Sequence, residues 1–175
     1  VLAVRGNFDE CQSAVKRIFT SESCKAELLQ KGIVLSSANS INFGRLAPQI
    51  AYYFSAYLDL VSSDQIEMGD RVNFAVPTGN FGNILAAYYA MRMGLPIGKL
   101  VCASNKNNIL TDFIRTGVYD KRRDFYKTMS PSMDILISSN LERLLFEISG
   151  RDAARVRALM DALSKEGVYS LSDAE

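Results

Sequence analysis

The sequence predicts an α/β protein with a doubly wound, mostly parallel β-sheet and helices on both faces, a Rossmann-like αβα arrangement of three layers. Short apolar runs, such as 71–76 and 99–103, alternate with segments in which apolar residues recur at helical spacing. Parallel strands need crossovers, and helical crossovers cover both faces of the sheet. In such sheets, ligands bind beyond the carboxyl ends of the strands.

The N-terminal region is expected to contain two strands and two helices. Val1–Arg5 is predicted to be a strand, and Gly6 opens a turn into a helix with apolar residues every three or four positions. Ser23 is the expected cap of a second helix that reaches Gln30. Ile33–Ser36 is then predicted to be a strand.

The middle of the chain has the clearest alternation. Residues 41–62 have helical spacing, with Pro48 in the first turns, where proline is tolerated. A strand at 71–76, a helix at 81–93 and a strand at 99–103 follow. The turns after the strands are therefore candidate sites.

The C-terminal third is predicted to be helical, with helices at 109–116, 135–148 and 152–165 and no second strand-rich block. No linker requires a second complete domain in the 175 residues, although residues 1–36 could belong partly to a smaller lobe. One principal core is the expectation.

The composition excludes several classes of function. Twenty basic and nineteen acidic residues give a net charge of +1, so we expect neither a nucleic-acid nor a membrane partner. The absence of histidine excludes a Ser-His-Asp triad and a His-ligated zinc site, and no metal site is expected. Three cysteines without paired spacing favour a reducing, cytoplasmic compartment.

The segment Val76-Pro77-Thr78-Gly79-Asn80-Phe81-Gly82-Asn83 joins a predicted strand to a predicted helix. Its glycines allow close backbone approach, and its asparagines lie beside the N–H groups of the first helical turn, which favours anion binding. It contains no lysine, as a Walker loop would, and it lacks the dinucleotide fingerprint. A monophosphate held by neutral donors and a plain turn with a helix cap both fit this pattern.

Five segments, which follow one another along the chain in the order found in the family, resemble the threonine synthases, which are fold type II pyridoxal-phosphate (PLP) enzymes. Besides Pro-Thr-Gly-Asn-Phe-Gly-Asn at 77–83, they are Val-Arg-Gly-Asn-Phe-Asp at 4–9, Ser-Ala-Asn-Ser-Ile-Asn at 37–42, Ala-Ser-Asn-Lys-Asn-Asn at 103–108 and Ser-Pro-Ser-Met-Asp-Ile at 130–135. The resemblance covers nearly the whole chain, and implies that residues 1–175 are part of a PLP-binding catalytic domain.

The resemblance also implies residue roles. The PLP phosphate would be surrounded by Gly79, Asn80, Phe81, Gly82 and Asn83. The substrate O-phosphohomoserine would lie close to Asn39, Ser40, Asn42 and Arg45, where the arginine can pair with a phosphate or a carboxylate. The local sequence alone favours a different reading, in which Asn39–Asn42 is the N-cap and turn that open the long helix.

None of the lysines of the chain lies in a segment that resembles the cofactor-lysine motif of the family, so no catalytic residue is assigned. That lysine is expected upstream of Val1, and the chain, which begins within a predicted strand, is expected to be an inactive fragment of a threonine synthase. Two alternatives are another fold type II PLP enzyme, such as a serine or threonine dehydratase, and a non-catalytic module that binds a phosphorylated metabolite. The oligomeric state cannot be predicted.

Overall fold

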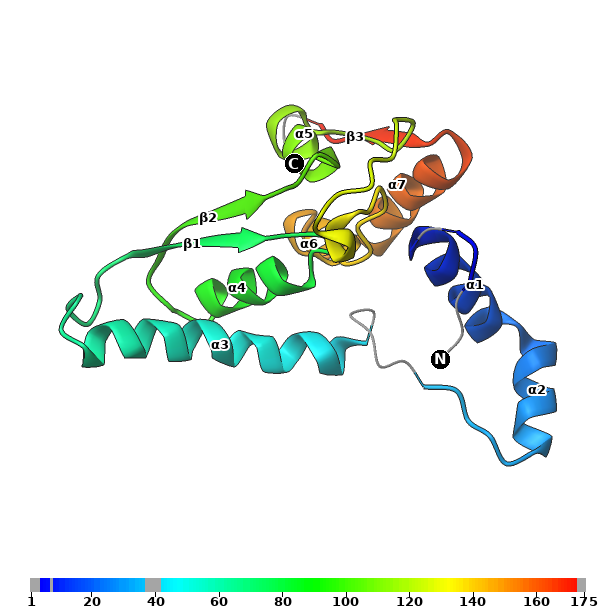
Figure 1. Cartoon of the computed structure of the whole chain (residues 1–175), viewed down its shortest axis with the longest axis horizontal. Helices are drawn as coiled ribbons and strands as arrows, with labels where there is room; N and C mark the ends of the chain where they lie inside the picture. The colour runs from blue at the N-terminus through cyan, green and yellow to red at the C-terminus, as the bar shows by residue number, and fades with distance from the viewer. Residues whose placement is uncertain (1–3, 7, 37–41, 173–175) are drawn as a thin grey trace. The chain divides into compact units, whose positions relative to one another are not determined.

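The structure is a computed structural model that describes residues 4–6, 8–36 and 42–172. The chain divides into two compact units, Val1–Asn39 and Ser40–Glu175, and each has its own packing. Parallel strands with a helical crossover lie in the second unit (Figure 1). The α/β class predicted from the sequence is confirmed.

The first unit contains two helices, α1 (Phe8–Thr20) and α2 (Glu22–Gln30). The cap of α2 is Ser21, whose hydroxyl accepts a hydrogen bond from the Cys24 N–H at 3.3 Å. The prediction of Ser23 as the cap is wrong, because Ser23 already lies inside the helix while Ser21 has the extended backbone that an N-cap requires.

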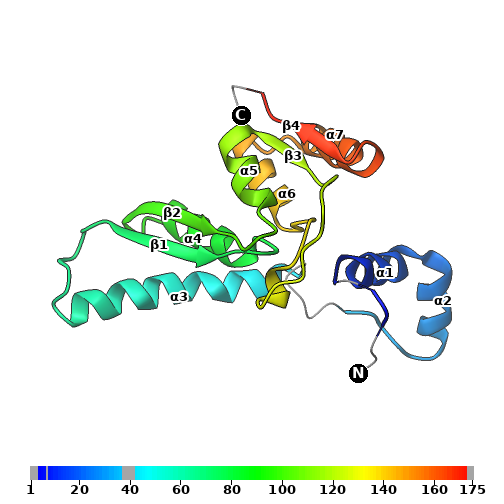
Figure 2. The same ribbon diagram turned by 45° about the horizontal axis from the view of Figure 1, so that its top comes forward.

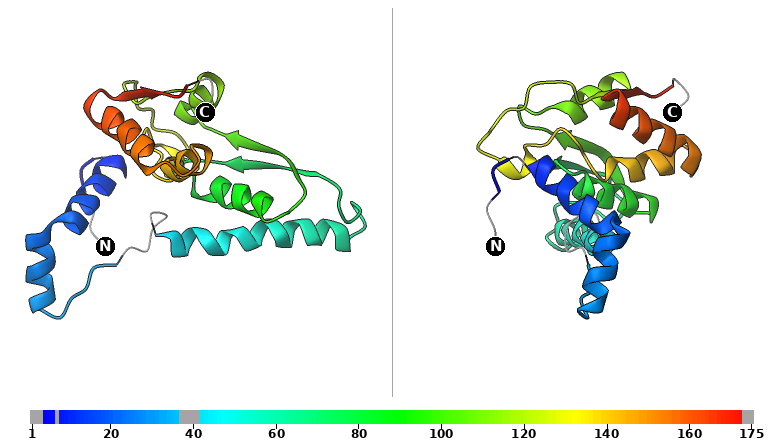
Figure 3. Two further views of the ribbon diagram at one scale, coloured as in Figure 1. Left: turned by 180° about the vertical axis from the view of Figure 1, so that it is seen from behind. Right: turned by 90° about the vertical axis from the view of Figure 1, so that its right-hand side faces the viewer.

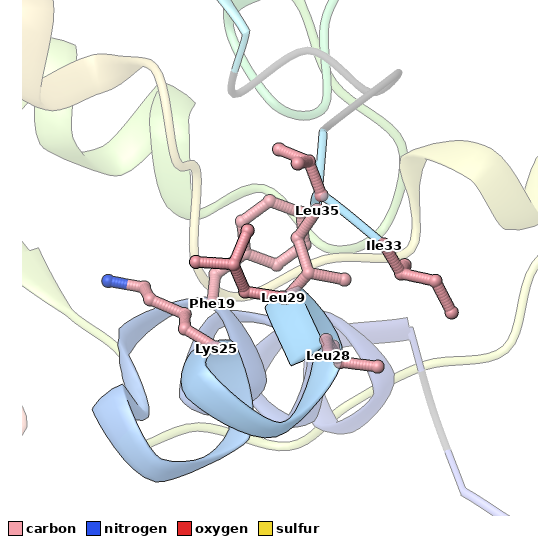
Figure 4. Close-up of a pocket in the computed structure, with 7 residues that line it drawn as sticks. Phe19, Lys25, Leu28, Leu29, Ile33 and Leu35 are labelled. Atoms are coloured by element: carbon pink, nitrogen blue, oxygen red, sulfur yellow. The ribbon is translucent and has the colours of Figure 1, made fainter. Parts of the chain in front are cut away.

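Residues 33–36 form no strand, so that prediction is wrong as well. Instead, this segment and the two helices line an apolar cavity of about 220 Å³ (Figure 4). Its lining residues are Phe19, Lys25, Leu28, Leu29, Ile33, Val34 and Leu35. Residues 4 and 5 of the other predicted strand are also irregular, and residues 1–3 lie outside the described residues.

The second unit begins with the long helix α3 (Phe43–Ser62). Asn42 caps it, because its side-chain oxygen accepts the Gly44 N–H at 2.8 Å, and the helix continues through Pro48. These contacts confirm that Asn42 caps the long helix.

Among the described helices, none combines the length and apolarity that a membrane span requires.

The strands β1 (Val72–Pro77) and β2 (Ile97–Ala103) pair in parallel, with α4 (Gly82–Arg92) between them in sequence. α3 and α4 cover the same face of the two strands in both Figure 1 and Figure 3. Tyr53 of α3 packs edge-on against Phe74 of β1, with ring centroids 5.1 Å apart. The parallel crossover predicted from the sequence is confirmed.

Helix α4 is the most completely buried helix among the described elements, since six of its eleven residues are buried. Its Ala86, Ala87 and Ala90 are fully buried, and such small side chains let neighbouring elements approach closely. Leu85 is also fully buried and belongs to the main apolar core. The packing of α4 fixes the position of its N-terminus. This end of the helix directly follows the glycine- and asparagine-containing loop at 77–83, which we call the candidate loop.

The C-terminal region contains α5 (Ile109–Thr116), α6 (Leu141–Ile148) and α7 (Ala153–Lys165). It also contains a short 3₁₀ helix, η1 (Pro131–Met133). Residues 135–140 are not helical, so the predicted helix 135–148 is too long at its start. These residues instead form hydrogen bonds with the candidate loop, as the Asn140 N–H does with the Asn80 carbonyl at 3.1 Å.

Two short strands after β2 were not predicted from the sequence. β3 (Val118–Asp120) and β4 (Val168–Ser170) form an antiparallel pair (Figure 2), in which Tyr119 lies opposite Tyr169. These two buried rings stack at 5.3 Å, and Phe113 packs edge-on against both. The pairing joins residues about fifty positions apart, so the local pattern of three-residue strands could not reveal it.

The packing predicts that truncation of Leu85 is costly. Leu85→Ala should lower the free energy of unfolding by about 2–5 kcal/mol, because it leaves a cavity in a fully buried site. The matched control Met93→Ala, at a side chain that is 66% exposed, should change it by less than about 0.5 kcal/mol. Urea denaturation measures both values. Equal effects of the two substitutions would contradict this description of the core.

Candidate functional site

The candidate site is the turn from β1 into α4, at the carboxyl end of a parallel strand. Thr78 anchors its start: its N–H donates to the Ala103 carbonyl at 2.9 Å, and its hydroxyl donates to the Val76 carbonyl at 2.7 Å. Phe81 anchors its end, since its side chain is buried in the main core. The backbone between these residues is thus held from both sides.

Five consecutive backbone N–H groups in this turn have no acceptor among the described residues. They belong to Gly79, Asn80, Phe81, Gly82 and Asn83, and α4 makes its first helical hydrogen bond only from the Leu85 N–H to the Phe81 carbonyl. The N-cap residue Phe81 provides no side-chain acceptor. The partial positive charge of the helix N-terminus and these free donors together favour an anion.

Phe81 has a left-handed backbone, with φ 66° and ψ −3°. A residue with a β-carbon pays about 1–2 kcal/mol for this conformation, which is why glycine or asparagine usually occupies it. Alternation of backbone conformations of this kind turns successive N–H groups toward one concave surface, as in anion-binding nests. The backbone strain at Phe81 is offset by burial of its phenyl ring. It occurs in the same turn as the N–H groups that have no acceptor among the described residues.

An open cleft of about 310 Å³ lies beside the turn. Its lining residues are Gln49, Pro77, Gly79, Asn80, Gly82, Asn83, Ser132 and Met133. None of these eight residues carries a charged side chain. Four of the five donor residues, Gly79, Asn80, Gly82 and Asn83, therefore border an accessible space, and the terminal oxygens of a phosphate ester can accept hydrogen bonds from such backbone donors.

The structure explains why position 79 is a glycine, which the sequence did not show. A β-carbon there would lie 3.2 Å from the Ser132 carbonyl oxygen and 3.3 Å from the Met133 Cα, both backbone atoms of η1. The absent side chain therefore lets η1 pack against the turn and form one wall of the cleft. The group that approaches Gly79 closely is therefore the backbone of η1.

The two asparagines of the turn form side-chain hydrogen bonds within the protein. The Asn83 amide donates to the Pro77 carbonyl at 2.7 Å, and its side-chain oxygen accepts the Ile84 N–H. The Asn80 side-chain oxygen accepts the Ser139 hydroxyl at 3.3 Å. The Asn83 side chain thus stabilises the turn itself, since its amide donates to the protein's own backbone.

The Asn83 carbonyl is held by Tyr53, whose hydroxyl donates to it at 2.8 Å. Burial raises the pKa of the Tyr53 phenol, so the hydroxyl stays protonated and keeps donating at neutral pH. This contact ties the turn to α3.

Two of the predicted substrate residues, Asn42 and Arg45, lie at the N-terminus of α3. Asn39 and Ser40 are outside the described residues. Asn42 caps α3, and Arg45 is exposed on its first turn, where its carbonyl accepts the Gln49 amide at 2.6 Å. Gln49 itself lines the cleft, whereas Asn42 and Arg45 do not.

Sequence reasoning missed Gln49, Ser132 and Met133 as lining residues. Gln49 follows Arg45 by one helical turn, so the two lie on the same side of α3, and this spacing could have identified it. Ser132 and Met133 lie in one of the segments that resembled the threonine synthases, but nothing in their sequence shows that they pack against Gly79.

A polar network fixes the segment that carries η1. The Asn105 amide donates to Thr128, Ser130 and Asp134, and the Asn107 amide donates to the Tyr126 carbonyl and to Asp134. The Asn105 side-chain oxygen accepts the Asn107 N–H, and Asn108, the N-cap residue of α5, makes no side-chain cap to that helix.

Asp134 is the acceptor at the centre of this network. Burial alone would raise its pKa, but hydrogen bonds from the Thr128 N–H and hydroxyl and from Asn105 and Asn107 outweigh it. The pKa of Asp134 therefore lies below its ordinary value, and the carboxylate is charged at neutral pH.

Known proteins align with nearly the whole of this sequence. Threonine synthase-like 1 of Homo sapiens is 51% identical over 175 aligned residues, which cover 99% of this chain and 24% of that protein. The threonine synthase of Methylobacillus glycogenes is 45% identical over 174 residues, which cover 98% of this chain and 35% of that protein. The chain thus spans about a quarter to a third of the length of these relatives. No protein-family model matches the chain.

Solved structures agree with the sequence relatives. PLP-bound threonine synthase from Brucella melitensis is 48% identical with a TM-score of 0.80, and the match covers 98% of this chain and 35% of that one. The yeast threonine synthase is 37% identical with a TM-score of 0.79, and the match covers 99% of this chain and 34% of that one. These likenesses confirm the predicted fold class.

The lowered pKa of Asp134 predicts a pH-dependent contribution to stability. A carboxyl whose pKa is lower in the folded than in the unfolded state stabilises the fold above the unfolded value of about 3.9, and loses this effect as the pH falls through the folded value. Asp134→Asn should therefore lower the urea midpoint at pH 7, and the difference from the unmutated protein should shrink below about pH 4.

The control Asp161→Asn, at an exposed carboxylate on α7, should leave the urea midpoint nearly unchanged at both pH values. A pH-independent effect of Asp134→Asn would contradict the assignment of a charged acceptor.

Proposed function

Because the chain is homologous over nearly its whole length to threonine synthases, we propose that the protein to which it belongs is a PLP-dependent threonine synthase. Such an enzyme converts O-phospho-L-homoserine and water to L-threonine and phosphate by β,γ-replacement. The identity of 45% to a threonine synthase over 98% of this chain supports the proposal.

In this proposal the turn at 79–83 binds the phosphate group of PLP. The observation that carries it is the run of five free N–H groups, from Gly79 to Asn83, beside an open and uncharged cleft. When bound, PLP supplies a conjugated ring that acts as an electron sink. The chain's own contribution is to grip the anionic end of the cofactor and so to orient it.

The N-terminus of α3 provides the proposed substrate wall. Asn39, Ser40, Asn42 and Arg45 are the residues assigned to O-phosphohomoserine by the family resemblance. The exposed guanidinium of Arg45 suits the phosphate or the carboxylate of that substrate, since its planar fork can donate two parallel hydrogen bonds. Gln49 joins this set because it lines the cleft from the same helix.

We also propose that the 175 residues have no activity by themselves. No lysine lines the cleft within the described part of the chain, and the reaction needs a lysine to hold the cofactor and move protons. Residues 1–36 are proposed to be part of a smaller lobe of the whole enzyme.

The proposed reaction can be tested on the full-length protein. With PLP and O-phosphohomoserine, it should release threonine and inorganic phosphate in equal amounts, and the 175-residue chain should release neither above a control with PLP alone. A dehydratase would release ammonia from serine or threonine without phosphate. Ammonia release without threonine formation, or turnover by the isolated chain, would contradict the corresponding part of the proposal.

The role of the turn can be tested at Gly79. Gly79→Ala places a methyl group 3.2 Å from the Ser132 carbonyl, so η1 must move and the cleft must change shape. Affinity of the full-length protein for PLP should fall at least about fivefold, as for the loss of one hydrogen bond. Absorbance titration with PLP measures this. Circular dichroism separates it from unfolding, and unchanged affinity in a folded variant would argue against a site at this turn.

A further inference from the structure

Residues 138–140, between η1 and α6, hold the outer side of the phosphate-binding turn. The Ser138 hydroxyl donates to the Gly79 carbonyl at 2.8 Å. The Asn140 backbone N–H and its side-chain amide both donate to the Asn80 carbonyl, at 3.1 and 3.0 Å. Two successive carbonyls of the turn are therefore tied to one segment, which lies about sixty residues further along the chain.

These contacts fix the direction of the free N–H groups. A trans peptide unit is planar, and its carbonyl and N–H point in opposite directions. The Gly79 carbonyl belongs to the same unit as the Asn80 N–H, and the Asn80 carbonyl to the same unit as the Phe81 N–H. When Ser138 and Asn140 hold the two carbonyls, the N–H groups of Asn80 and Phe81 must point away from residues 138–140.

The cleft borders residues of the same two peptide units. Its lining includes Gly79 and Asn80 but none of residues 138–140. Residues 138–140, which we call the clamp, and the cleft therefore contact different sides of the same two peptide units. Without the clamp, either unit could rotate and present a carbonyl oxygen to an anion.

The clamp is itself fixed by the core. Asn140 is fully buried and Ser138 is 7% exposed. The Ser138 N–H donates to the Tyr119 hydroxyl at 2.9 Å, and Tyr119 lies in the stacked aromatic core. The Asn140 side-chain oxygen accepts a hydrogen bond from Arg143. Asn140 is the N-cap residue of α6 but makes no side-chain cap to it, so its amide serves the turn instead.

We propose that Ser138 and Asn140 are positioning residues for the phosphate of the cofactor. They orient the peptide units of Gly79 and Asn80 so that the N–H groups of Asn80 and Phe81 face the anion. The inference rests on the proposed function, because it assumes that the turn binds the PLP phosphate. Neither side chain lines the cleft, so both act through the backbone of the turn.

The test compares two ligands that differ only in the phosphate. Dissociation constants of the full-length protein for PLP and for pyridoxal give a ratio that isolates the phosphate contribution. Ser138→Ala and Asn140→Ala should each reduce the preference for PLP about fivefold, the effect of one lost hydrogen bond, while the affinity for pyridoxal stays the same. The matched control is Ser149→Ala, which removes a hydroxyl bonded to the Phe146 carbonyl at the end of α6 and should leave the ratio unchanged.

The outcomes separate the two proposals. If the unmutated protein shows no preference for PLP over pyridoxal, the proposed phosphate site itself fails. If it prefers PLP, but the two variants keep the same ratio, the positioning role alone is overturned. Equal losses of affinity for both ligands would also overturn it, because they would indicate a general structural defect. Circular dichroism and thermal unfolding identify any variant that does not fold, and Ser138→Cys, which keeps a weak donor of similar size, then replaces Ser138→Ala.

Discussion

The candidate site depends on how the polar groups of one backbone turn are divided between the protein and the cleft. The carbonyls of Gly79 and Asn80 are bonded to residues 138–140, while the N–H groups from 79 to 83 have no acceptor among the described residues. Unpaired backbone donors near the interior are costly, and proteins rarely leave several together. Their concentration at a helix N-terminus is explained if an anion completes the site.

The surrounding structure supports this division. α4 is packed against the strands and α3 through small and apolar side chains, so its first turn cannot shift easily. The Asp134 network holds η1 against Gly79, and the aromatic core around Tyr119 holds Ser138. The left-handed conformation of Phe81 is tolerated because the elements on both sides of the turn are fixed.

Much of the central fold could be predicted from the sequence, because its signals are local. The alternation of apolar strands and amphipathic helices from 43 to 116 gave elements close to α3, β1, α4, β2 and α5. β3 and β4 could not be predicted, since each has three residues and depends on a partner distant in sequence. The segment 135–140 looked helical by its apolar residues, yet its polar groups are required by the turn at 79–80.

The site likewise has one part that local sequence signals reveal and another that depends on contacts between distant residues. The turn itself was found from its glycines and asparagines, but Gly79 admits η1, and the Asn83 side chain bonds to the turn. Ser138 and Asn140 gave no local signal, because an ordinary serine and asparagine acquire their role only when tertiary packing brings them to the turn.

The most direct measurement is of the five amides themselves. Isotope-labelled full-length protein can be titrated with PLP and with pyridoxal while the backbone amide proton resonances of residues 79–83 are followed by NMR. The account predicts downfield shifts of these resonances with PLP, because charged acceptors strengthen the hydrogen bonds, and much smaller shifts with pyridoxal. Saturable PLP binding that leaves all five resonances in place would contradict it.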